Sequence, residues 1–149
     1  NRELAGDDHP NVAINLGNLA SVAAGLGRHD EAEELYRESL AIKTARLGKD
    51  HPSVAVALSG VALALENQGH LEQALASYRD ALGVLVAAFG ADHGRTALVR
   101  ARVGGCWIRS GDVETGESLR AASYPLVADE LGADHHLVAE VFGQDFGGH

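Results

Sequence analysis

The sequence predicts an all-α protein: a right-handed superhelical solenoid of antiparallel helix hairpins. Three observations predict this fold. A short segment recurs at a fixed step, apolar residues between its copies recur every three or four positions, and aromatic residues are scarce. Aromatics make up 5% of the chain and Met is absent. A core of Ala, Leu and Val favours packed helices, because a β-sandwich would need more aromatic and β-branched side chains.

The recurring segment marks the repeat boundaries. The pattern Gly-x-Asp-His begins at Gly6, Gly48, Gly90 and Gly132, so its copies are equally spaced with no insertion or deletion between them. The predicted repeats are 10–51, 52–93 and 94–135, with a partial repeat at 136–149. We expect residues 1–149 to form one domain. We also expect it to belong to a longer chain, because Asn1 to Leu4 resemble the end of an earlier second helix.

The first helix of each repeat follows the marker segment. Pro10 suits the first turn of a helix, where its missing N–H has no intrahelical partner, and Gly27 suits the turn that ends it. Apolar side chains at steps of three and four predict one buried stripe. That stripe is Val12, Leu16, Leu19, Ala23 and Leu26.

The second helix of the first repeat begins with acids, which suit the positive end of the helix dipole. They are Asp30, Glu31, Glu33 and Glu34. The residues expected to face inward are Ala32, Leu35, Tyr36, Ser39 and Leu40. Lys43 and Arg46 lie near the negative end, before Gly48 closes the helix.

Later repeats follow the same plan with some departures. The second runs from Pro52 to Phe89 and the third from Arg95 to Leu131, with turns at Gly69 and Gly111. In the third repeat Gly116 replaces an alanine and Arg120 replaces the core tyrosine. Pro125 falls inside a helix, so we expect a bend or short break near Tyr124. A fourth first helix begins near His136, and Gly143, Gly147 and Gly148 predict that it ends early.

Charge and composition exclude several functions. The net charge of −9 argues against binding nucleic acid or an anionic membrane surface. No apolar run reaches the length of a membrane helix. Cys106 is the single cysteine and cannot form an internal disulfide, which favours the reducing cytoplasm.

The motifs resemble a known family, the tetratricopeptide repeat, in the 42-residue form found in kinesin light chains and many bacterial proteins. The resemblance rests on the string Leu-Gly-Lys-Asp-His-Pro-Ser-Val-Ala at 47–55, on Leu19-Ala20 and Gly27, and on Ala32 through Tyr36. It covers essentially the whole chain. It implies a concave groove, lined by the first helices, that binds peptides or partner helices. It also implies that Asn18 hydrogen-bonds the backbone of a ligand, although Gly60 and Arg102 stand at the matching later positions.

The predicted groove residues lie opposite the core stripe of each first helix. They are Asn18, Ser21, Ser59, Leu63, Asn67, Arg102 and Arg109, accompanied by Ile14, Gly25, Val56, Gly60, Leu98 and Gly105. Arg102 and Arg109 share one helix face in a segment with no acid. We expect them to bind an acidic side chain or a C-terminal carboxylate of the partner, with Gly60, Ala101 and Gly105 giving its backbone room. The alternative is that both pair internally, with Glu66 or Glu140.

Two other features allow a chemical interpretation, and in both a structural role is favoured. The Asp-His pairs recur at identical places, as structural punctuation does. Cys106 and Trp107 lie on an apolar helix with no histidine placed to activate the thiol, so a buried pair is expected. We therefore expect no catalytic residue, metal or cofactor.

The leading interpretation is a non-enzymatic module that binds a protein or peptide segment. One alternative is a structural solenoid whose apolar ends associate with other copies, because no polar cap is evident. Another is the sensory arm of a larger signalling protein.

Overall fold

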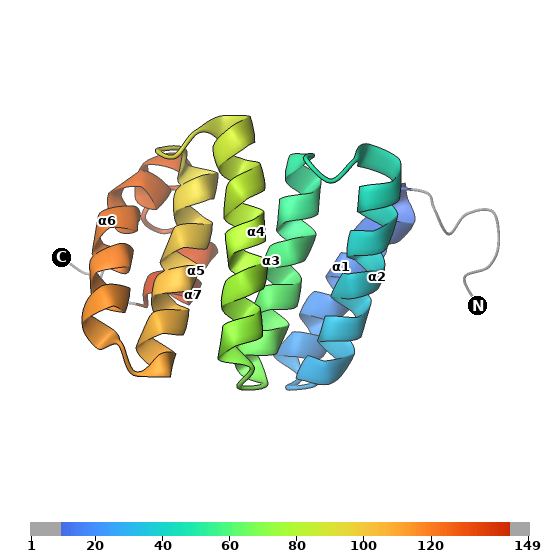
Figure 1. Cartoon of the computed structure of the whole chain (residues 1–149), viewed down its shortest axis with the longest axis horizontal. Coiled ribbons are helices and arrows are strands. Elements are labelled where there is room, and N and C mark those ends of the chain that lie inside the picture. The colour runs from blue at the N-terminus through green and yellow to red at the C-terminus, as the bar shows by residue number, and fades with distance from the viewer. Residues whose placement is uncertain (1–9, 144–149) are drawn as a thin grey trace. The chain divides into compact units, whose positions relative to one another are not determined.

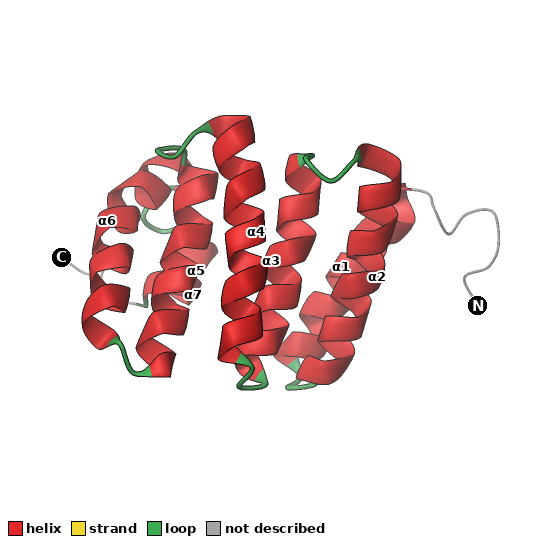
Figure 2. Ribbon diagram, in the orientation of Figure 1, coloured by secondary structure: helices red, strands yellow, loops and turns green. Residues whose placement is uncertain are grey.

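The computed structural model describes residues 10–143, and every regular element in that range is an α-helix (Figures 1 and 2). The helices are α1 (Pro10–Gly25), α2 (His29–Leu47), α3 (Pro52–Asn67), α4 (Leu71–Phe89), α5 (Gly94–Ser110), α6 (Val113–Leu131) and α7 (His136–Phe142). The first helices begin at equal intervals along the chain, and so do the second helices. The predicted all-α class and the predicted helix pairs are confirmed.

The chain divides into two compact units between Val84 and Leu85, within α4. The first unit contains α1, α2, α3 and the larger part of α4. The second contains the end of α4 with α5, α6 and α7. Neighbouring helices within each unit are antiparallel and joined by short loops (Figure 1).

The histidines of the repeated Asp-His segment cap the first helices. The Nδ1 atoms of His51, His93 and His135 accept hydrogen bonds from the backbone N–H groups of Ser53, Arg95 and Leu137, at 3.0, 3.1 and 3.1 Å. Each bond satisfies an N–H that the first helical turn leaves without a partner. This is the structural role predicted for the repeated segment. His9, in the first copy, lies outside the described residues.

In the first unit, one face of α1 is packed and the opposite face is open. The packed face consists of small and apolar side chains, Ala13, Leu16, Ala20 and Ala23. Ser39 of α2 donates a buried hydrogen bond to the carbonyl of Ala13, at 2.8 Å. The prediction that Leu19 and Leu26 are buried was wrong, since they are 54% and 64% exposed. Both lie on the open face of α1, which no described helix covers.

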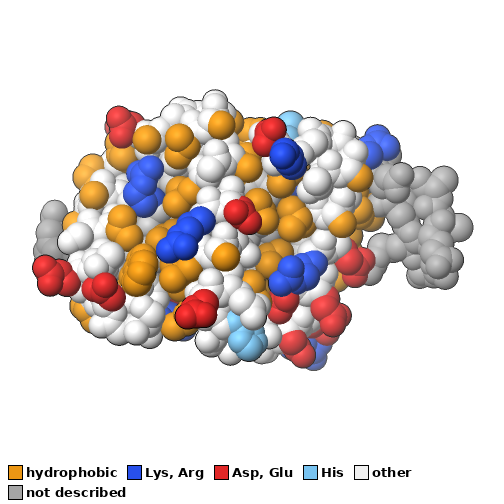
Figure 3. All heavy atoms as spheres, in the orientation of Figure 1, with side chains coloured by type: hydrophobic (Ala, Val, Ile, Leu, Met, Phe, Trp, Pro, Cys, Tyr) orange, Lys and Arg blue, Asp and Glu red, His pale blue; other side chains and the backbone are white. Residues whose placement is uncertain are grey.

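Acidic side chains gather over the start of α2 (Figure 3). Asp30 and Glu31 lie in its first turn. Farther along, Glu33 links the start of α2 to the end of α3, because Gln68 donates to Glu33 at 2.9 Å. This hydrogen bond, followed by the Arg37 guanidinium, lowers the pKa of the Glu33 carboxyl against the opposing effect of its burial.

In the second unit, α5 and α6 pack backbone against backbone. A Cβ atom added to Gly104 would lie 2.7 Å from the carbonyl oxygen of Gly116, and one added to Gly116 would collide with Gly104 and Ile108. The corresponding pairs in the first unit are alanines, Ala20 with Ala32 and Ala62 with Ala74. Gly116 therefore replaces alanine where the two helices approach too closely for a side chain.

The other departures of the third repeat also have structural explanations. α6 is continuous from Val113 to Leu131 with Pro125 inside it, so the expected break near Tyr124 is absent. Packing on both sides of Pro125 holds the helix together, since Ser123 and Val127 are buried. Arg120 donates to the carbonyl of Phe142, at 2.7 Å, and thereby closes the end of α7.

The seventh helix ends as predicted. Gly143 follows it with φ +77°, a backbone conformation that favours glycine. The other two glycines of that prediction, Gly147 and Gly148, lie outside the described residues.

Candidate functional site

The free surface of the first unit is formed by α1 and α3, which contact each other. Each helix carries its predicted stripe at steps of three and four. On α1 the stripe contains Ile14, Ser21 and Gly25, and on α3 it contains Val56, Ser59, Leu63 and Asn67. Ile14 and Val56 are 53% and 62% exposed although both are large and apolar. Because they occupy the same position in successive repeats, their side chains are neighbouring apolar groups on one surface.

Tyr36 of α2 forms the floor between these two helices. Its ring lies against Gly60 of α3, where an added Cβ would collide with ring atoms. Its hydroxyl and the Oγ of Ser21 on α1 are hydrogen-bonded at 3.0 Å. One side chain of α2 therefore ties α1 to α3 beneath the surface that both present.

The prediction that Gly60 leaves room for a ligand was wrong, because the Tyr36 ring fills that room. Sequence reasoning assigned Tyr36 to the core and missed the position of its hydroxyl. The sequence did contain a signal that a side chain packs here: position 60 is a glycine, whereas the equivalent residues of the other repeats, Asn18 and Arg102, are larger. Only the structure shows which tyrosine the glycine accommodates, since the equivalent Tyr78 is fully buried and donates to Glu66 at 3.0 Å.

The predicted polar residues of this surface differ in accessibility. Asn18 and Ser21 are exposed, whereas Leu63 and Asn67 are half-buried. The Oγ atom of Ser59 is covered and has no hydrogen-bond partner among residues 10–143. Ser59 is half-buried, and its side chain therefore offers no accessible polar atom to a ligand.

In the second unit the predicted arginines lie on α5. Arg102 donates from Nη2 to Oε1 of Glu140 on α7, at 3.2 Å. Glu140 is one of the two internal partners that the sequence offered as the alternative to a ligand. Arg109 is exposed near the end of the helix. Gly105 and Ala101 were both expected to leave room for the backbone of a ligand. An added Cβ at Gly105 would meet no atom within 4 Å, whereas Ala101 is buried, so only Gly105 leaves such room.

Cys106 and Trp107 follow the structural interpretation in part. Cys106 is fully buried, and Trp107 is half-buried on the same helix.

Within residues 10–143, no three His, Cys, Asp or Glu side chains gather where they could hold a metal ion. None of the helices in that range is both long and apolar enough to cross a membrane.

Comparison with known proteins relates the chain to helical repeat proteins. Residues 1–45 and 12–87 match the family model of the tetratricopeptide repeat. The fold is similar to a Podosopora anserina putative kinesin light chain with nearly identical TPR-like repeats, with TM-score 0.73 and 20% identity over 89% of this chain and 63% of that one. A variant of that protein matches with TM-score 0.72, at the same identity and coverage.

A third solved structure, BtubC (BKLC) from P. vanneervenii, has TM-score 0.70 and 18% identity over 93% of this chain and 59% of that one. The chain thus spans 63% of the length of the kinesin light chain structures and 59% of BtubC. No curated protein matches it.

Proposed function

This chain belongs to the tetratricopeptide repeat family, and from that premise we propose that it is a non-enzymatic module that binds a segment of a partner protein on its first helices. The resemblance to kinesin-light-chain repeats predicted from the sequence is confirmed. Members of such a fold share the ability to present extended surfaces to partner chains. The kind of segment and the residues that hold it are the substance of the proposal.

One observation carries the proposal. Ile14 and Val56 are more than half exposed, at matching positions on adjacent first helices, over a floor fixed by Tyr36. Exposed apolar side chains beside polar ones are typical of interaction sites. Asn18, Ser21 and Asn67 would supply hydrogen bonds to the backbone of the segment, and Leu63 would add apolar contact. In the second unit Arg102 would contribute only after it exchanges Glu140 for a ligand, and Arg109 is the other predicted cation.

The test is selection of short random peptides on the immobilised chain. Val56→Asp is expected to weaken the selected peptides by about tenfold, or ~1.4 kcal/mol, because it places a charge against their apolar contact. Val56 is exposed, so the variant is expected to fold. Val113→Asp is the matched control, since Val113 is 52% exposed but lies at the start of α6. Isothermal titration would measure both variants. Failure to select any peptide, or equal affinity for both variants, would contradict the proposal.

A second function is favoured by the open face of α1. Val22 is 60% exposed, whereas its counterparts in the second and third repeats, Ala64 and Cys106, are 2% and 0% exposed. Likewise Leu19 is exposed while Val61 is buried. The later first helices thus bury a face that α1 leaves open. We infer that a second copy of the chain covers this face, so that two molecules associate through α1.

Sedimentation at several concentrations would test this association. The wild-type chain is expected to increase in mass with concentration, and Val22→Glu is expected to remain monomeric because it buries a charge in the contact. Val56→Glu, which changes an equally exposed valine on α3, is expected to associate like the wild type. A monomeric wild-type chain, or association unaffected by Val22→Glu, would exclude this function.

A further inference from the structure

Lys43 occupies a position that the other repeats give to the core. It lies on α2, and its counterparts in the second and third repeats are Leu85 and Val127, which are 5% and 0% exposed. The fold therefore accepts an apolar side chain at this position. A lysine there places an ammonium group where two repeats place hydrocarbon.

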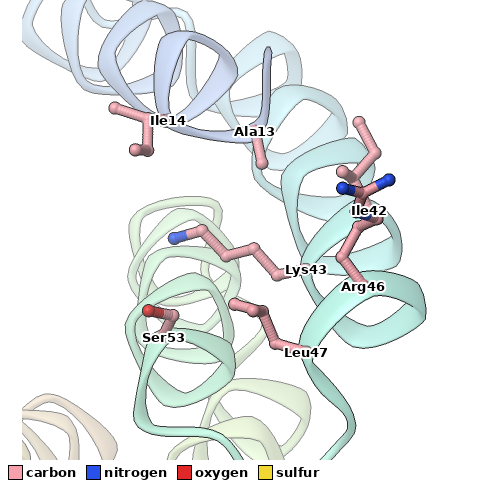
Figure 4. A pocket seen from close by; sticks show the side chains of 7 residues that line it. All are labelled: Ala13, Ile14, Ile42, Lys43, Arg46, Leu47 and Ser53. Atoms are coloured by element: carbon pink, nitrogen blue, oxygen red, sulfur yellow. The ribbon is translucent and has the colours of Figure 1, made fainter. Parts of the chain in front are cut away.

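The Lys43 side chain points into a cavity of about 130 Å³ at the junction of α1, α2 and α3 (Figure 4). In this view its Nζ atom lies between the side chains of Ile14 and Ser53. The rest of the lining is Ala13, Ile42, Arg46 and Leu47. Two of the lining residues are cationic and none is an acid, although the chain as a whole carries a net charge of −9.

No hydrogen bond or ion pair joins the Lys43 ammonium to any of residues 10–143. Arg37 and Arg102 differ in this respect, since both bond to carboxylates of the same unit. Burial lowers the pKa of the Lys43 ammonium, with no opposing contribution from a nearby acid. An ammonium that is partly removed from water is unfavourable unless an anion accompanies it.

The site adjoins the surface proposed to bind a partner segment. Ile14 belongs both to the cavity wall and to the exposed stripe of α1. Ser53 lies in the first turn of the neighbouring first helix, α3, and the N-terminal end of a helix carries partial positive charge. A segment lying along α1 and α3 would therefore pass the mouth of a cationic cavity with apolar walls.

We propose that this cavity binds a carboxylate of the partner segment, held by the Lys43 ammonium with its methylene groups against Ile14 and Leu47. The inference rests on the proposed function and names the chemistry of the bound segment. The sequence predicted that Arg102 binds this carboxylate, but Arg102 already pairs with Glu140. Lys43 has no such partner among the described residues. The carboxylate is either an acidic side chain or the C-terminus of the segment.

The experiment compares matched peptides. Each selected peptide would be made with its acidic side chains intact or changed to amides, and with a free or an amidated C-terminus. Removal of the recognised carboxylate is expected to weaken binding to the wild-type chain about tenfold, and the form that loses affinity identifies its source. Lys43→Met is expected to bind the peptides with and without the carboxylate equally, at the affinity that the wild-type chain shows for peptides without it. Lys43→Arg is expected to keep the preference for the carboxylate. Lys43→Met should fold, because Leu85 and Val127 occupy the same position.

The chain offers an internal control, because Lys43 and Lys49 are its only lysines. After reductive methylation with ¹³C, an acidic peptide is expected to shift the Lys43 methyl signal in the NMR spectrum. The signal of Lys49, exposed in the loop after α2, is expected to stay in place. Peptides that bind Lys43→Met as tightly as the wild type would overturn the inference and leave the peptide-binding surface intact. Absence of any binding peptide would overturn both.

Discussion

Gly116→Ala is expected to destabilise the second unit by about 3 kcal/mol, the upper range for overpacking a tightly packed contact. The new methyl group would collide with the backbone carbonyl of Gly104 and with Ile108. A backbone atom cannot move aside as the end of a long side chain can, so α5 and α6 would have to separate. Their separation would loosen the packing along both helices.

Urea denaturation followed by tryptophan fluorescence would measure this effect. Trp107 is the only tryptophan of the chain and lies on α5, so its signal reports the second unit. Gly105→Ala is the control on the same helix, because an added Cβ at Gly105 meets no atom within 4 Å. That change is expected to stabilise the unit by up to about 1 kcal/mol, through the higher helix propensity of alanine. If both variants were equally stable, the close approach of α5 and α6 would be refuted.

Pro125→Ala is expected to stabilise the second unit by about 2 kcal/mol. Proline inside a helix lacks an N–H donor and lowers the free energy of unfolding by roughly 3 kcal/mol. Proline also restricts the unfolded chain, which offsets up to about 1 kcal/mol of that loss. Pro125 lies within the continuous helix α6, and its ring is exposed, so alanine removes no core contact. The N–H of the alanine would restore the missing hydrogen bond to the carbonyl of Ala121.

Pro52→Ala is the matched control for this substitution. Pro52 lies in the first turn of α3, where the N–H would have no intrahelical partner. It is expected to change stability by less than about 1 kcal/mol. The urea midpoint followed by circular dichroism would measure the control, and Trp107 fluorescence would measure Pro125→Ala. An unchanged midpoint for Pro125→Ala would mean that α6 already satisfies the Ala121 carbonyl without distortion.

The candidate site was predicted less completely than the helices. Spacing predicted Ile14, Ser21, Val56 and Leu63 for the groove stripes, and the structure leaves Ile14, Ser21 and Val56 exposed and Leu63 half-buried. It also placed Gly60 there, because Gly60 lies close to the same helical angle. The ring of Tyr36, which belongs to the preceding helix of the chain, covers Gly60 and removes it from the surface. Lys43 appeared only as a cation suited to the end of α2, because nothing local reveals the cavity into which it points.

The sequence by itself determined the helices and their ends. The fixed step of the repeats, the glycines after each helix and the capping histidines act over short stretches of chain, so their effect is readable without knowledge of the fold. His51, for example, caps α3 through a bond to Ser53, its neighbour but one in the chain.

Tertiary structure decided which faces are covered and which charges are paired. α1 carries one apolar stripe through Leu16 and Ala23 and another through Leu19 and Leu26, and its own sequence does not distinguish them. Burial depends on which helices pack alongside, and those lie far away in the chain. The pairing of Arg102 with Glu140 is of the same kind, because it depends on where α7 lies against α5.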